Sequence, residues 1–138
     1  MAAGDPYASP DDAVGAALAE TFPNGMGEIS GIFKPEYRGF IFQFTDTFGR
    51  LWYSYTPTEK GSYLGDEDPK YGLLTKEGDD HIYLVDKSSQ QTVKVAEPGT
   101  TKQREVKDVV GVWHSHGGLT KDPVFGTADD KYMEKKTK

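Results

Sequence analysis

The stretch Val109-Val110-Gly111-Val112-Trp113-His114-Ser115-His116 is the most apolar run of the chain, and it ends in two of the three histidines. Its β-branched residues, together with the apolar residue Val106 before them, predict a buried strand over residues 106–113. Side chains of a strand repeat their direction every two residues, so we expect His114 and His116 to point to the same side. Two imidazoles at the end of a strand favour a divalent metal, zinc in particular. The alternative is a pair of surface histidines before a Gly117-Gly118 turn.

A helix is predicted near the start of the chain. Ser9 can cap it, Pro10 suits its first position, and Asp11-Asp12 favours the positive end of its dipole. The apolar residues that follow have helical spacing up to Phe22, and Pro23-Asn24-Gly25 is expected to end the helix.

The middle of the chain predicts several strands. Alternating residues over 37–45, with Phe40, Phe42 and Phe44 as one apolar stripe, indicate the first arm of a hairpin whose second arm is 50–56. Further elements are expected: a short strand or turn at 28–33, a long loop with at most one short element at 57–80, strands at 81–85 and 92–95, and a final helix at 127–136. This order predicts an α+β fold with a mostly antiparallel or mixed sheet, flanked by an N-terminal and a C-terminal helix.

Composition narrows the class of protein. The 138 residues predict a single domain over 9–138, preceded by a tail or linker over 1–8. The net charge of -6 argues against a nucleic-acid binder, and the absence of apolar runs of about 18 residues argues against a membrane partner. The chain has no cysteine, so thiolate zinc sites, cysteine nucleophiles and disulfides are excluded. The first residues also lack the pattern of a signal peptide.

A zinc hydrolase needs a third protein ligand and an open position for water. Asp129 and Asp130 are the candidates, because they lie beyond the histidine pair at the start of the predicted final helix. His81 is interpreted as a surface histidine, and Ser115 lacks the glycines of a nucleophile elbow. Both tryptophans, Trp52 and Trp113, are interpreted as core residues.

Two groups of residues carry a resemblance to known families. The segment from Val110 to Gly117, followed by Phe125-Gly126-Thr127-Ala128-Asp129, resembles the metal motif of JAMM (MPN-type) metallopeptidases. Together with Glu36-Tyr37-Arg38-Gly39-Phe40-Ile41-Phe42 and Tyr53-Ser54-Tyr55-Thr56-Pro57, it more closely resembles a domain-of-unknown-function family found at the C-termini of Rhs-type polymorphic toxins. The resemblance spans roughly Asp11 to Asp129.

The resemblance implies a JAMM/deaminase-like mixed sheet and a Zn²⁺ site. His114, His116 and Asp129 would be the metal ligands, and Glu36 would be the general acid/base, with Glu28 as the second choice. The family's serine before the aspartate is Gly126 here. A shift by one residue instead makes Thr127 the hydroxyl donor and Asp130 the ligand.

The implied function is hydrolysis of a peptide or isopeptide bond by an antibacterial effector domain. The resemblance implies type VI secretion as part of a parent Rhs polypeptide without a signal peptide, and a cognate immunity protein. It also implies action on a protein or peptide substrate in the target cell, in the cytoplasm rather than the periplasm. Two alternatives remain: a binding module with a degraded site on the same fold, and a metal-dependent amidase or phosphodiesterase.

Overall fold

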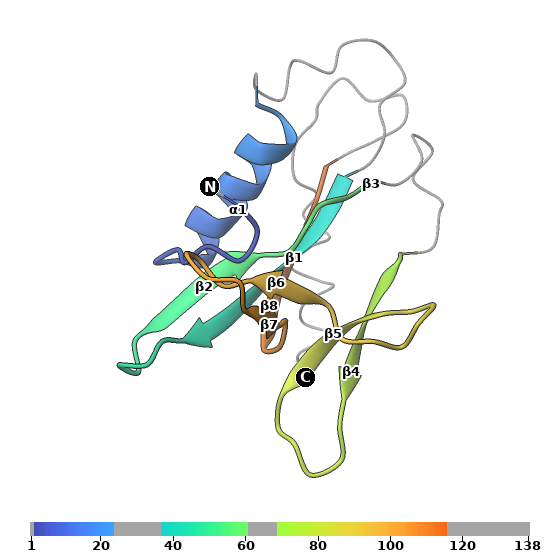
Figure 1. The fold of residues 1–138 in the computed structure, drawn as a ribbon. Coiled ribbons are helices and arrows are strands. Elements are labelled where there is room, and N and C mark those ends of the chain that lie inside the picture. The colour runs from blue at the N-terminus through green and yellow to red at the C-terminus, as the bar shows by residue number, and fades with distance from the viewer. Residues whose placement is uncertain (1, 24–36, 61–68, 116–138) are drawn as a thin grey trace.

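The computed structural model describes residues 2–23, 37–60 and 69–115. One helix, α1 (Pro10–Thr21), packs on a sheet formed by β1 (Tyr37–Thr45), β2 (Leu51–Tyr55), β3 (Glu59–Lys60) and β8 (Val109–His114). The other strands form two hairpins, one of β4 (Tyr71–Thr75) with β5 (Ile82–Asp86), and one of β6 (Lys94–Ala96) with β7 (Gln103–Glu105). All these pairings are antiparallel, so the described part of the chain has the α+β class expected from the sequence (Figure 1).

Helix α1 begins as the sequence predicts. The Ser9 hydroxyl accepts a hydrogen bond from the backbone N–H of Asp12 at 3.1 Å, and Pro10 occupies the first turn. The helix buries alanines against the sheet, which allows its backbone to lie close to the strands. This helix is too short to cross a membrane, and none of the other described segments forms a helix that could do so.

The strand β1 is the centre of the sheet. It pairs with β2 and β3 on one side and with β8 on the other, and Val110 is an extra residue on β8 where the register shifts. Because side chains alternate along a strand, Ile41 faces α1, whereas Phe40 and Phe42 face the two hairpins. The predicted aromatic stripe is therefore confirmed as packing.

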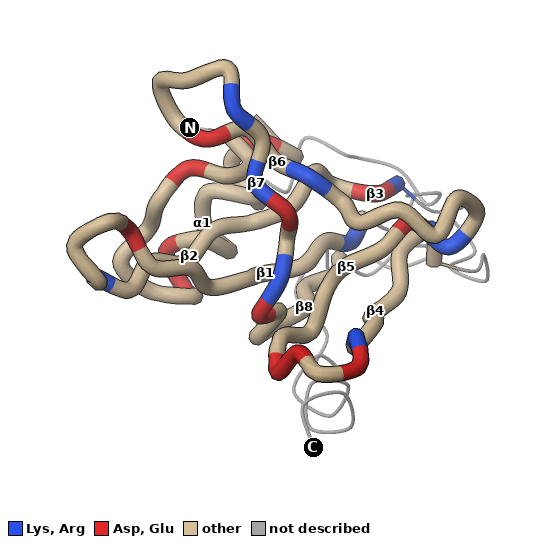
Figure 2. The backbone as a smooth tube through the Cα atoms, turned by 60° about the horizontal axis from the view of Figure 1, so that its bottom comes forward, with Lys and Arg blue, Asp and Glu red and all other residues tan. Residues whose placement is uncertain are grey.

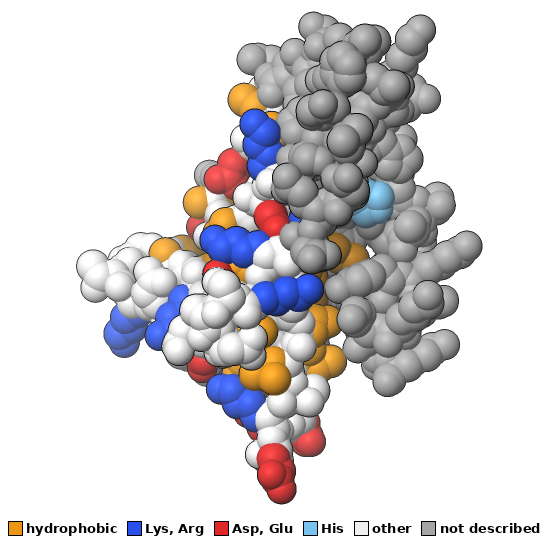
Figure 3. Space-filling view, turned by 90° about the vertical axis from the view of Figure 1, so that its right-hand side faces the viewer, with side chains coloured by type: hydrophobic (Ala, Val, Ile, Leu, Met, Phe, Trp, Pro, Cys, Tyr) orange, Lys and Arg blue, Asp and Glu red, His pale blue; other side chains and the backbone are white. Residues whose placement is uncertain are grey.

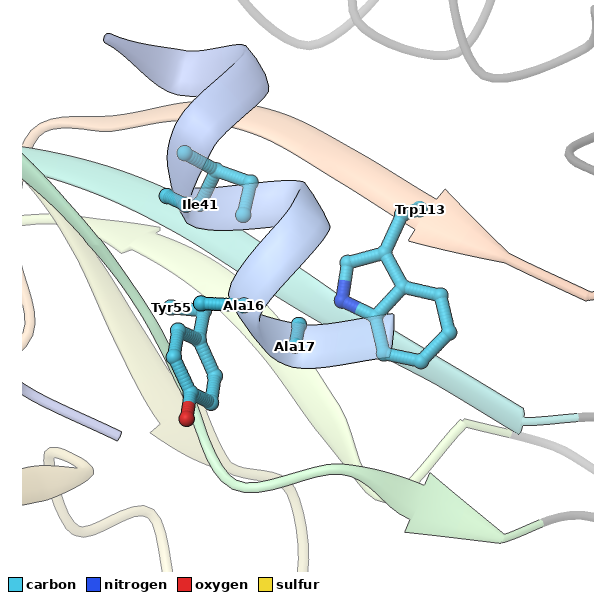
Figure 4. Packing of buried hydrophobic residues seen from close by; sticks show 6 residues of the cluster. Ala16, Ala17, Ile41, Tyr55 and Trp113 are labelled. Carbon is cyan, nitrogen blue, oxygen red and sulfur yellow. The ribbon is translucent and has the colours of Figure 1, made fainter. Parts of the chain in front are cut away.

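The core has two parts, one on each face of this sheet. On the α1 face, Trp113 is 1% exposed and packs with Tyr55, Ile41 and the alanines of α1. Figure 4 shows the Trp113 indole beside Ala17. On the opposite face, Phe40 and Phe42 pack with residues of the hairpins and of the segment before β8. The core position predicted for Trp113 is confirmed.

The other tryptophan differs from the prediction. Trp52 is only partly buried, its indole N–H donates to Asp46 at 2.9 Å, and the Arg50 guanidinium lies 3.9 Å from its ring centre. It therefore supports the β1–β2 turn rather than the core.

Three further expectations differ from the structure. The predicted tail over 1–8 holds residues that bond to β2: Tyr7 exchanges two 2.8 Å backbone hydrogen bonds with Tyr53. The predicted loop over 57–80 contains β3 and all of β4, since β4 pairs with β5. The long strand predicted over 106–113 is broken at Asp108, whose φ of 57° lies in the left-handed region. The segments predicted at 28–33 and 127–136 lie outside the described residues.

Candidate metal centre

His114 is the last residue of β8 and is half-buried. It stands directly opposite Arg38 of β1, so both side chains lie on the face of the sheet away from α1. The neighbouring residue Trp113 points to the α1 face, which agrees with the alternation that the sequence predicts at this strand end.

The start of β1 lies beside the end of β8. The backbone N–H of Ser115 donates to the carbonyl of Tyr37 at 2.8 Å, and the N–H of Tyr37 donates to the Ser115 hydroxyl at 3.0 Å. Ser115 is 2% exposed, so its hydroxyl closes the sheet and does not face a substrate. Tyr37 follows Glu36 in the sequence, and Ser115 separates His114 from His116. The sheet therefore joins the two motif segments that lie far apart in the chain.

An ion pair lies next to His114 on the same face. Arg38 also stands opposite Glu59 of β3, and its Nε lies 3.4 Å from the Glu59 carboxylate. Both side chains are largely buried, at 14% and 11% exposure, and Glu59 also accepts the backbone N–H of Lys70 at 2.5 Å. Glu59, Arg38 and His114 thus form a row across three strands. Sequence reasoning missed Arg38 and Glu59, because only the register of β1 with β3 and β8 shows that they adjoin His114.

The remaining predicted site residues lie outside the described part of the chain: Glu28, Glu36, His116, Gly126, Thr127, Asp129 and Asp130. Within residues 2–23, 37–60 and 69–115, no three His, Asp or Glu side chains gather as metal ligands. His114 is accordingly the one predicted ligand that the structure describes. It lies half-buried at a strand end, directly before Ser115, which is bonded to Tyr37.

A second cluster surrounds His81, which was interpreted as a surface histidine. Its Nδ1 lies 2.8 Å from the Asp108 carboxylate, and its backbone N–H donates to Asp79 at 2.8 Å. The hydrogen bond from Tyr83, followed by that backbone bond, lowers the pKa of Asp79 below its usual 3.8. The same Tyr83–Asp79 bond raises the pKa of Tyr83 to about 12. His81 is half-exposed, as predicted, but it is held in a polar network.

No protein-family model matches this chain, and comparisons with curated proteins and with solved structures likewise find no match. The site is therefore argued from its own residues.

Proposed function

We propose that this protein is a zinc-dependent hydrolase that cleaves a peptide or isopeptide bond. The observation that supports the proposal is the pairing of Tyr37 with Ser115, which joins the segment after Glu36 to the segment between His114 and His116. A JAMM-like site requires these two segments to be neighbours, although they are more than seventy residues apart in the sequence.

In this proposal, His114, His116 and Asp129 hold Zn²⁺, with Asp130 as the alternative to Asp129. The metal would supply a Lewis acid that lowers the pKa of water at the open position. Glu36 would take the proton from that water and give it to the leaving amine. The hydroxyl of Thr127 is the candidate donor to the oxygen of the scissile carbonyl.

Arg38 is a further candidate for that last role. Gly126 has no hydroxyl where the family has a serine, and a missing oxyanion donor costs about 3 kcal/mol of barrier in other enzymes. The Arg38 guanidinium lies on the same face as His114 and is largely buried, so its charge acts in a medium of low dielectric. Glu59 balances that charge and orients the guanidinium. We propose that Arg38 contributes to stabilising the negative charge that develops on the carbonyl oxygen.

The biological setting is also a proposal. By its resemblance, the domain would be an effector carried by a parent Rhs polypeptide and delivered by a type VI secretion system into the cytoplasm of a target cell, where a cognate immunity protein neutralises it. The acidic net charge of -6 supports a protein or peptide substrate over a nucleic acid.

Metal content tests the site. The purified protein should hold about one zinc per chain, as a three-ligand hydrolase site does, and His114→Ala should lose it. His81→Ala is the matched control, because His81 is also half-exposed but lies near the other end of β1, and it should keep its zinc. Full zinc occupancy in a His114→Ala/His116→Ala double variant would refute the site.

Toxicity tests the activity. Expression of the wild-type chain in the bacterial cytoplasm should arrest growth, while Glu36→Gln should be tolerated and should still bind zinc, because Glu36 is not proposed as a ligand. The second candidate function, a binding module with a degraded site, is favoured by Gly126. A native protein that is free of metal and unfolds at the same temperature with and without a chelator would favour the module.

A further inference from the structure

A cavity of about 470 Å³ lies at the opposite end of β1 from His114. Its wall is the β1 segment from Phe42 to Thr45 on one side; on the other side it is lined by His81, Arg104, Glu105, Lys107 and Asp108. Gln43 is five residues from Arg38 along β1, or about 17 Å, so this cavity is separate from the candidate metal centre. Figure 2 shows basic and acidic residues along the chain from β7 toward β8. A volume of this size suits a small organic molecule.

The cavity contains a fixed His–Asp pair. Asp108 is held by its own backbone, because its N–H donates to Ile82 at 2.8 Å and its carbonyl accepts from Gln43 at 3.1 Å. Its φ of 57° is rare for a residue other than glycine, and such strain persists where the surroundings enforce it. The Asp108 carboxylate therefore keeps His81 Nδ1 at 2.8 Å, which leaves the second ring nitrogen of His81 as the one that can meet a ligand.

The two carboxylates of the cavity wall are bonded to groups of the protein. Asp108 is bonded to His81, and Glu105 accepts the Thr92 hydroxyl at 2.7 Å. Glu105 and Arg104 are neighbours on β7, so their side chains point to opposite faces of that strand. Arg104 lies over the Phe44 ring at 3.9 Å, and this places its charge on the β1 side.

The wall also carries two cationic side chains, Lys107 and Arg104, and neither forms a salt bridge with these two carboxylates. Among the described residues, Lys107 forms no salt bridge, and the only salt bridge of Arg104 is a 3.5 Å contact to Glu97, which does not line the cavity. Gln43 adds a side-chain amide, and Phe44 adds an apolar surface. A ligand that complements this wall carries an acceptor-rich anionic group and a small apolar part.

From this arrangement we infer that the cavity is a binding site for a small organic anion that carries a carboxylate or a phosphate. Lys107 and Arg104 contact the anionic group, and the Phe44 and His81 rings pack against the apolar part. The Asp108 carboxylate sets the orientation of the His81 ring. This inference does not depend on the proposed zinc site.

Nuclear magnetic resonance titration of the full chain tests it, with benzoate and phenyl phosphate as probes and benzyl alcohol as their uncharged counterpart. Either anion at millimolar concentration should shift the amide signals of Gln43, Phe44, His81 and Asp108, and benzyl alcohol should not. Comparison of the two anions shows which group the site prefers. If neither anion shifts these signals, or if benzyl alcohol shifts them equally, the inference is wrong.

Variants then assign the contacts. Lys107→Gln should weaken binding of the preferred anion about tenfold, as loss of a charge-assisted hydrogen bond does. Lys102→Gln is the matched control, because Lys102 is an exposed lysine of the turn before β7 and does not line the cavity. His81→Gln serves as the second variant and should also weaken binding. Wild-type affinity in both Lys107→Gln and His81→Gln would overturn the inference.

Discussion

Replacement of Gly39 by alanine should destabilise the fold by about 1 to 3 kcal/mol, the usual cost of overpacking a core. Gly39 stands opposite Trp113 in the β1–β8 pair, and the indole lies over it. A Cβ at position 39 would be 2.7 Å from Trp113 Nε1, closer than real contacts allow, and 3.2 Å from Cε2, which is a tight contact. The indole is 1% exposed and packs against the alanines of α1, so it cannot turn away without moving the helix.

The assay is urea unfolding followed by far-ultraviolet circular dichroism. The matched control is Gly15→Ala in α1, where a new Cβ has no heavy atom within 4 Å. That variant should be more stable than wild type by about 0.5 to 1 kcal/mol, because alanine loses less backbone entropy in a helix. A Gly39→Ala protein as stable as wild type, with an unchanged denaturant slope, would refute the packing argument. If the zinc site is as proposed, Gly39→Ala should also weaken zinc binding, since His114 follows the displaced Trp113.

Three further predictions concern charged groups. The hydrogen bond from the Trp52 indole lowers the pKa of Asp46 below 3.8. The ionised Asp46 carboxylate therefore stabilises the fold above that pH, and this stabilisation is lost as the pH falls through the lower pKa of the folded state. In Asp46→Asn, the melting temperature should depend less on pH below about pH 4 than it does in wild type. The hydrogen bond to Asp79 raises the pKa of Tyr83 to about 12, so the contribution of this bond to stability is complete below the unfolded value of 10.0 and is lost as the pH rises through 12. The difference between the ultraviolet titrations of wild type and Tyr83→Phe should show one tyrosine that ionises near pH 12. Glu59→Gln should lower the free energy of unfolding by about 3 kcal/mol, because the largely buried Arg38 guanidinium then lacks the Glu59 carboxylate. The double variant Arg38→Met/Glu59→Gln should lower it by less, because no buried charge is left. Urea unfolding that finds the double variant less stable than Glu59→Gln would contradict this.

One face of the described part of the chain carries side chains of mixed character. On the face shown in Figure 3, hydrophobic, basic and acidic side chains are interspersed.

Local patterns were enough to predict the elements that depend on neighbours in the chain. The capping serine and the proline after it predicted where α1 begins, and the alternating aromatic residues predicted the β1–β2 hairpin. The position of His114 at the end of a buried strand followed from the apolar run before it. In each case, the interactions that form the element lie within a few residues of one another, so the sequence displays them directly.

Contacts between distant segments were decided only by the tertiary structure. The left-handed residue Asp108 interrupts the long strand predicted over 106–113, because the chain passes there from β5 to β1: the N–H of Asp108 donates to Ile82, and its carbonyl accepts from Gln43. The row of Glu59, Arg38 and His114 and the His81–Asp108 pair follow likewise from long-range register. The sequence by itself determined the start of α1, the β1–β2 hairpin and the strand end at which the first histidine of the motif stands. Which side chains meet was decided by how those strands pair, because register depends on the packing of the whole core and not on any one segment.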